Sequence, residues 1–146
     1  MSTRSNIIIH SEIEKKSCVL YHHCDGYPEG VGVHLCELIR SVGFLSFDNT
    51  RTRIQEDSDY ETTDGIHGDI EYLYVVLADN AKVICFVANN WNGDQFGNGI
   101  KAKYLGDMMD QSNLDLILNG GRAMEDSEDI PDLKTFLLAV RDNMEE

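Results

Sequence analysis

The sequence lacks any apolar stretch long enough to cross a membrane. A membrane helix needs about 20 consecutive apolar residues, and the apolar run nearest the N-terminus is only Ile7–Ile9. A secretory signal needs an apolar stretch about twice as long as that run. These absences predict no membrane partner, and we expect the protein to act in a cytoplasm.

Cysteine pairs of the CxxC type are also absent, although the chain has four cysteines: Cys18, Cys24, Cys36 and Cys85. A chain of 146 residues buries about 68–70% of its unfolded surface and does not need disulfides to hold a core. We therefore expect four reduced thiols. The length also fits one domain spanning residues 1–146.

Basic residues are scarce. The chain has 12 Lys and Arg against 26 Asp and Glu, which gives a net charge of −14. Residues 1–55 hold six acidic and six basic side chains, so the negative charge belongs to residues 56–146. Such a field repels nucleic-acid phosphates and anionic membranes. It excludes direct nucleic-acid binding and favours a basic protein partner.

The first half of the chain predicts a β-hairpin followed by a helix. Residues 5–10 and 17–24 are rich in β-branched and aromatic side chains and are separated by a short polar stretch. After a break at Asp25–Gly30, apolar residues from Val31 to Val42 follow helical spacing.

The second half predicts another hairpin and two more helices. Residues 48–69 are polar and acidic with little periodicity, so we expect a long loop there. Apolar residues over 70–77 and 82–88 flank a turn. Two further segments, about 113–119 and 131–143, have apolar residues on one helical face.

These elements together predict an α+β fold. We expect a mainly antiparallel sheet of about four strands, made from the two hairpins. Two or three helices are expected to pack on one face of this sheet.

Reactive side chains gather around the break that follows the second strand. We expect turn chemistry in Asp25–Pro28, with Asp25 bonded to its own backbone and Gly26 at a positive φ. A polar binding site is the alternative. A metal site formed by His23, Asp25 and His10 is a further alternative. No HxH, HExxH or CxxC spacing accompanies these residues, so no metal or cofactor is predicted. The candidate binding residues are Tyr21, His23, Asp25, Tyr27, Glu29 and, from a Gly/Asn-rich loop, Trp91.

No catalytic residue can be assigned from the sequence. Cys24 and Cys36 lie near histidines, but a reactive thiol needs a positive environment, and Asp25 and Glu29 oppose it. Gly30 begins a Gly-x-Gly pair before a helix, yet no third glycine or GK[ST] follows, which argues against nucleotide binding.

Two stretches resemble a family of small uncharacterised proteins encoded by tailed phages, prophages and bacterial mobile regions. Its members begin with a TRSN- or TRSL-like motif, as in Thr3–Asn6 here, and continue with a Y-x-H-x-DGYP-x-G-x-G segment. Cys24 stands where relatives often have an aromatic residue. The resemblance implies an accessory protein in a bacterial cytoplasm. The matching residues are Tyr21, His23, Asp25, Gly26, Tyr27, Pro28, Gly30 and Gly32.

Three functional hypotheses remain open. The first is a non-catalytic acidic module that binds or inhibits a basic host protein, in one form by imitating nucleic acid. The second is a small metal-assisted hydrolase that uses His23 and Asp25. The third is a structural protein that forms homo-oligomers through a hairpin edge in residues 70–88.

Overall fold

The computed structural model describes residues 3–88, 102–124, 127–130 and 132–144. A six-stranded mixed sheet forms its centre, in the order β3-β2-β1-β4-β5-β6. The strands are β1 (Ser5–Ser11), β2 (Lys16–His22), β3 (Glu61–Thr63), β4 (Tyr72–Leu77), β5 (Lys82–Val87) and β6 (Lys103–Asp107). The helices are the π-helical turn η1 (Pro28–Gly32), α1 (Val33–Arg40), α2 (Phe47–Gln55), α3 (Gln111–Leu118) and α4 (Leu133–Asp142).

Both predicted hairpins are present, and a parallel pairing joins them. β1 pairs with β2 and β4 pairs with β5, each in antiparallel register. β1 also lies beside β4 in parallel, with Ile8 opposite Val75. The chain reverses at Lys15 and Ala81, two non-glycine residues with positive φ. The α+β class is therefore confirmed, and the sheet has six strands instead of about four.

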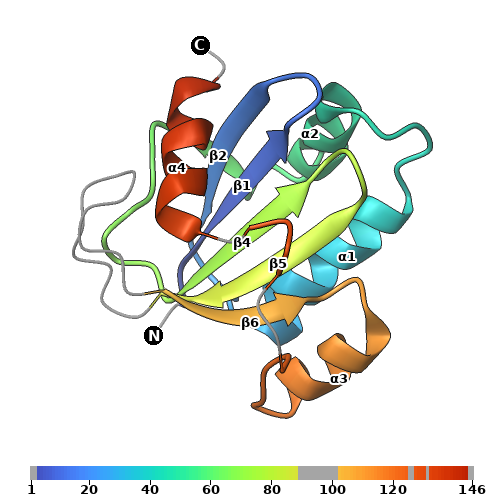
Figure 1. Ribbon diagram of the computed structural model, residues 1–146, viewed down its shortest axis with the longest axis vertical. Coiled ribbons are helices and arrows are strands. Elements are labelled where there is room, and N and C mark those ends of the chain that lie inside the picture. Colours follow the sequence, from blue (N-terminus) through green and yellow to red (C-terminus); the bar gives the residue numbers. More distant parts are fainter. Residues whose placement is uncertain (1–2, 89–101, 125–126, 131, 145–146) are drawn as a thin grey trace.

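The helices cover both faces of the sheet, so the prediction of helices on one face is wrong (Figure 1). Ile7 and Ile9 of β1 face the core beneath α1, α2 and α3. Ile8 faces the other side, where Leu137 and Val140 of α4 pack. An unbroken apolar run such as Ile7–Ile9 is typical of a strand buried on both faces, and this signal indicates two covering layers.

The segment predicted as a long loop contains two elements. Helix α2 begins after Ser46, whose side chain accepts a hydrogen bond from the Asn49 amide. Its buried face has only Phe47, Thr50 and Ile54, which is too sparse a pattern to stand out in a polar sequence. Strand β3 has no apolar residue and pairs with β2, and its side chains bond to His23, Gln55 and His67. The loop prediction is therefore wrong for both stretches.

The two C-terminal helices are confirmed, and one strand was not predicted. Asp110 and Asp132 cap α3 and α4 by accepting backbone N–H bonds. Strand β6 pairs with β5 and extends the sheet by one strand.

The predicted oligomerisation edge is not available in this fold. β4 lies between β1 and β5, and β5 lies between β4 and β6, so neither strand of residues 70–88 is an edge. The hypothesis of pairing through that hairpin is therefore wrong in this form. In the part of the chain that the structure describes, no helix has the length and apolarity to span a bilayer.

A candidate binding site at the end of strand β2

The DGYP segment is a tightly fixed turn. Asp25 has a φ of 53°, so it takes the left-handed conformation that we expected of Gly26. The Gly26 amide donates to the Thr3 carbonyl (2.9 Å), and the buried Tyr74 hydroxyl donates to the Gly26 carbonyl (2.6 Å). A Cβ on Gly26 would lie 2.9 Å from the Thr3 oxygen. The glycine at this position is therefore explained by close approach of the backbone.

Gly30 is required for a second close approach. A Cβ there would lie 2.3 Å from the Asp25 carbonyl oxygen, which accepts the Val31 amide at 2.8 Å. These contacts fix the position of η1, and of the following helix α1, relative to the turn. The D-G-Y-P-x-G spacing therefore has a structural cause, but the expectation that Gly26 takes the positive φ is wrong, because Asp25 takes it.

The alternation of β2 places Tyr21 and His23 on the α4 side of the sheet. Their rings meet edge to face at a centroid distance of 4.6 Å. His22 points to the opposite side and lies 4.7 Å from the Tyr60 ring. Asp25 does not join His23 as predicted. Its left-handed backbone follows the end of the strand, and its side chain lines a pocket together with His22.

His10 is far from this end of the sheet. In the antiparallel register His10 is opposite Ser17, whereas Ser5 is opposite His22. His10 bonds instead to Ser17 (Nδ1 to Oγ, 2.6 Å) and packs against Phe136. The alternative of a metal site formed by His23, Asp25 and His10 is therefore wrong, because these residues do not come together.

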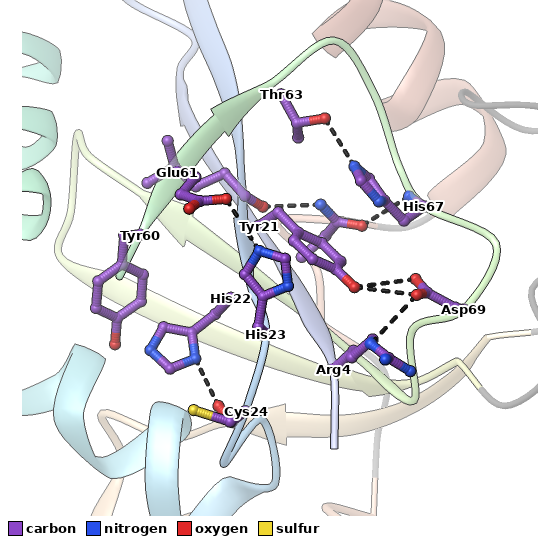
Figure 2. A network of polar contacts seen from close by, with 12 residues as sticks. Arg4, Tyr21, His22, His23, Cys24, Tyr60, Glu61, Thr63, His67 and Asp69 are labelled. Carbon is purple, nitrogen blue, oxygen red and sulfur yellow. Dashed lines mark hydrogen bonds and ion pairs between the residues drawn. The ribbon is translucent and has the colours of Figure 1, made fainter. Parts of the chain in front are cut away.

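Tyr21 is the centre of a polar network on the α4 side (Figure 2). Its hydroxyl donates to Asp69 (3.0 and 3.3 Å), which also pairs with Arg4 at 3.4 Å. Burial, followed by the hydrogen bond to Asp69, raises the pKa of Tyr21 to about 12. The His67 ring stacks on Tyr21 at 4.0 Å. The network holds the chain beyond β3 against β2.

His23 links β2 to the edge of the sheet. Its Nε2 lies 3.0 Å from a carboxylate oxygen of Glu61, in β3, and both side chains are more than half exposed. Thr63, at the end of β3, bonds to His67 through its hydroxyl (2.8 Å). The predicted residues Tyr21 and His23 thus fasten β3 and the 67–69 loop.

A pocket of about 270 Å³ opens on the other side of the β2 end. We call it the His22 pocket. It contains five side chains that can accept or exchange protons, together with Tyr60. Its lining is His22, Cys24, Asp25, Gly30, Val31, His34, Asp59 and Tyr60.

Hydrogen bonds fix the aromatic wall of the His22 pocket. His22 is only 7% exposed, and its Nδ1 lies 2.5 Å from the Cys24 carbonyl, which can only accept. Nδ1 therefore donates, and Nε2 makes no hydrogen bond with any residue in the described ranges. His34 Nδ1 lies 2.8 Å from the Tyr60 hydroxyl. Burial raises the pKa of Tyr60 well above its usual value, so its phenol stays neutral.

The geometry gives no support to a metal or nucleophile in this region. Within the described residues, no three His, Cys, Asp or Glu side chains are arranged to hold a metal ion. No disulfide joins any of the four cysteines, all of which lie in the described residues. Burial raises the pKa of Cys36 to about 11, which keeps that thiol protonated and unreactive at neutral pH.

The remaining predicted residues lie around the rim or outside the described structure. Tyr27 is partly exposed, and its hydroxyl donates to Asp25 (3.1 Å), a contact that raises the pKa of Tyr27. Glu29 is exposed in the first turn of η1. Trp91 lies outside the described residues.

The sequence reasoning missed several residues of the site. His34 follows Pro28 by six residues, less than two helical turns. This spacing could have placed it near the turn that follows His22. Asp59 and Tyr60 come from the segment predicted as a loop, so no sequence signal connected them with β2. The chain matches no family model, no curated protein and no solved structure.

Proposed function

We propose that this protein is a non-catalytic module that binds a basic protein partner through the acidic edge of its sheet. We define the acidic edge as the carboxylates of residues 56–69 that surround β3. They are Glu56, Asp57, Asp59, Glu61, Asp64 and Asp69.

The observation that carries this proposal is the charge at the open edge of the sheet. The 56–69 segment holds six carboxylates and no Lys or Arg. Among the described residues, Arg53 pairs with Glu56 and Arg4 with Asp69, and His23 lies 3.0 Å from Glu61. Asp57, Asp59 and Asp64 form no ion pair there. Unpaired carboxylates that face water attract a cationic surface and speed its association.

The shape of this region also suits a protein partner. β3 is the terminal strand of the sheet and pairs only with β2. Its outer backbone groups face away from the sheet, which makes a terminal strand a template for pairing with another chain. With three residues, β3 offers only a short template. Charge therefore supplies most of the attraction in this proposal.

The resemblance to phage and mobile-element proteins supports a bacterial host protein as the partner. In one form of the proposal, the carboxylates take the place of nucleic-acid phosphates on the partner's basic surface. Such binding weakens steeply with added salt. The salt dependence of affinity therefore distinguishes charge-driven binding from binding through apolar contacts.

The test is affinity capture from nuclease-treated bacterial lysate, eluted in a salt gradient and identified by mass spectrometry. The matched variants are Asp57→Asn/Asp59→Asn/Asp64→Asn at the acidic edge and Asp115→Asn/Glu128→Gln/Asp142→Asn elsewhere. Both lose three negative charges. We expect a basic protein that elutes at moderate salt from the wild type and the control but is lost from the edge variant. Equal retention by both variants would contradict the proposal.

A further inference from the structure

We propose that the His22 pocket binds the guanidinium group of an arginine side chain on the protein partner. This inference rests on the proposed function, because it names the group of the basic partner that the site would recognise. The pocket lies beside the acidic edge, and Asp59 belongs to both.

The buried wall of the pocket offers a hydrogen-bond acceptor. His22 donates from Nδ1 to the Cys24 carbonyl, so a neutral ring presents a lone pair at Nε2. His22 is 93% buried, since only 7% of it is exposed, and it lines the pocket. In the described residues, the buried side-chain atoms without a partner are the Ser5 and Thr50 hydroxyls, so Nε2 of His22 is open to solvent. A donor that enters the pocket can therefore replace water at Nε2.

The rim adds two negative charges. Asp25 and Asp59 line the pocket, and the lining contains no Lys or Arg. Asp25 uses one carboxylate oxygen to accept from Tyr27, which leaves the other without a hydrogen bond among the described residues. A ligand with several donors and a positive charge complements this set of acceptors.

A guanidinium group fits these acceptors better than an ammonium group. Guanidinium is planar and carries five N–H donors in a fixed fork, whereas ammonium is a compact point charge. It also stacks on aromatic rings. The ring of His34, which lines the pocket and is only partly buried, is available for such stacking. Tyr60 is 2% exposed, and its ring already contacts those of His22 and His34.

The dimensions of the pocket indicate a single side chain. Its volume of about 270 Å³ is below the roughly 300–1,000 Å³ of pockets for drug-sized ligands. A metal ion would need ligands that converge to about 2.0–2.3 Å, and no three side chains of the described residues are arranged in that way. An arginine side chain of a docked protein fits the small volume and does not need converging ligands.

The test compares two blocked ten-residue peptides of glycine, serine and lysine that differ only in a central Arg or Lys. Calorimetry at low salt measures their affinity for the wild type and for two charge-matched variants. Asp25→Asn/Asp59→Asn changes the pocket, and Asp57→Asn/Asp64→Asn changes only the acidic edge. Asn at position 25 tolerates positive φ and can still accept from Tyr27, so the pocket variant keeps its fold.

We expect the wild type to prefer the Arg peptide by about five-fold, which corresponds to about 1 kcal/mol. The pocket variant loses this preference, and the edge variant keeps it while binding both peptides more weakly. In NMR spectra, the Arg peptide shifts the Gly30 and Val31 amides more than the Lys peptide does.

Three results would overturn the inference in distinguishable ways. If the wild type binds both peptides equally and in a salt-dependent manner, the pocket does not recognise guanidinium, but the proposed function stands. If neither peptide binds at low salt, the proposed function fails too. If blocked arginine alone binds as tightly as the Arg peptide, the ligand is a small guanidinium compound and not a protein.

Discussion

The centre of the sheet and its β3 edge are built from opposite kinds of residue. β4 and the Ile7–Ile9 centre of β1 are apolar, and both strands are buried and paired on both sides. β3 is polar, exposed and paired on one side only. Because burial of apolar area is the main source of folding free energy, the centre stabilises the molecule. The edge contributes little stability, so its side chains are free to serve binding.

The largest effect is expected from removing apolar volume at the centre. Ile8 is fully buried between Val19 and Val75. Ile8→Ala should lower the free energy of unfolding by about 2–5 kcal/mol. The matched edge variant, Thr62→Ala, should cost less than about 1 kcal/mol because its side chain is exposed. Urea denaturation measures both, and similar costs would contradict the division between centre and edge.

The next effect tests the tight turn after β2. A Cβ at position 30 would overlap the Asp25 carbonyl, whereas a Cβ at Gly43 would meet nothing within 4 Å. Gly30→Ala should destabilise the protein by about 1–3 kcal/mol, and Gly43→Ala should stay within about 0.5 kcal/mol. Thermal unfolding of the two variants gives the comparison. If Gly30→Ala leaves the free energy of unfolding unchanged, the turn is not rigid.

A comparable effect is expected at the hydrogen bond that anchors this turn to the centre. Tyr74→Phe removes the buried donor to the Gly26 carbonyl and should cost about 1–3 kcal/mol. Tyr72→Phe is the control, since its half-buried hydroxyl forms no hydrogen bond with the described residues. Urea midpoints for the two variants should therefore differ, and equal midpoints would argue against this anchor.

The smallest stability effect is a pH dependence at the network that fastens the edge. The folded pKa of Tyr21 is raised from 10.0 to about 12, so the fold favours the neutral phenol. Its contribution is present below pH 10 and is lost as the pH rises from 10 to 12. Tyr21→Phe should therefore be less stable than the wild type at pH 9, by on the order of 1 kcal/mol. This gap should narrow by pH 11, and a constant gap would contradict the role of Tyr21.

The same contrast explains what could be predicted from the sequence. The two hairpins are local and apolar, so alternation and turn residues identified them. The parallel contact of β1 with β4 joins segments about 65 residues apart, and no periodicity records which strands become neighbours. Helix α2 and strand β3 were missed because their polar sequences carry little of the apolar pattern on which such predictions depend.

The candidate site could be predicted only in part, for a similar reason. Alternation along residues 17–24 predicts that Tyr21 and His23 share a face, and their rings do meet there. It failed at Asp25, because a left-handed residue ends the alternation. Asp59 and Tyr60 reach the His22 pocket through the tertiary fold, which a single sequence does not show.

The most direct test of the account measures stability and binding on one variant. In Asp57→Asn/Asp59→Asn/Asp64→Asn, the free energy of unfolding should stay within about 0.5 kcal/mol of the wild type. Affinity for a ten-residue oligolysine peptide at low salt should fall roughly ten-fold, since each exposed charge contact contributes about 0.2–1 kcal/mol. The charge-matched variant Asp115→Asn/Glu128→Gln/Asp142→Asn should lose clearly less affinity. Equal losses in the two variants, or a large loss of stability at the edge, would contradict the claim that this edge is built for binding.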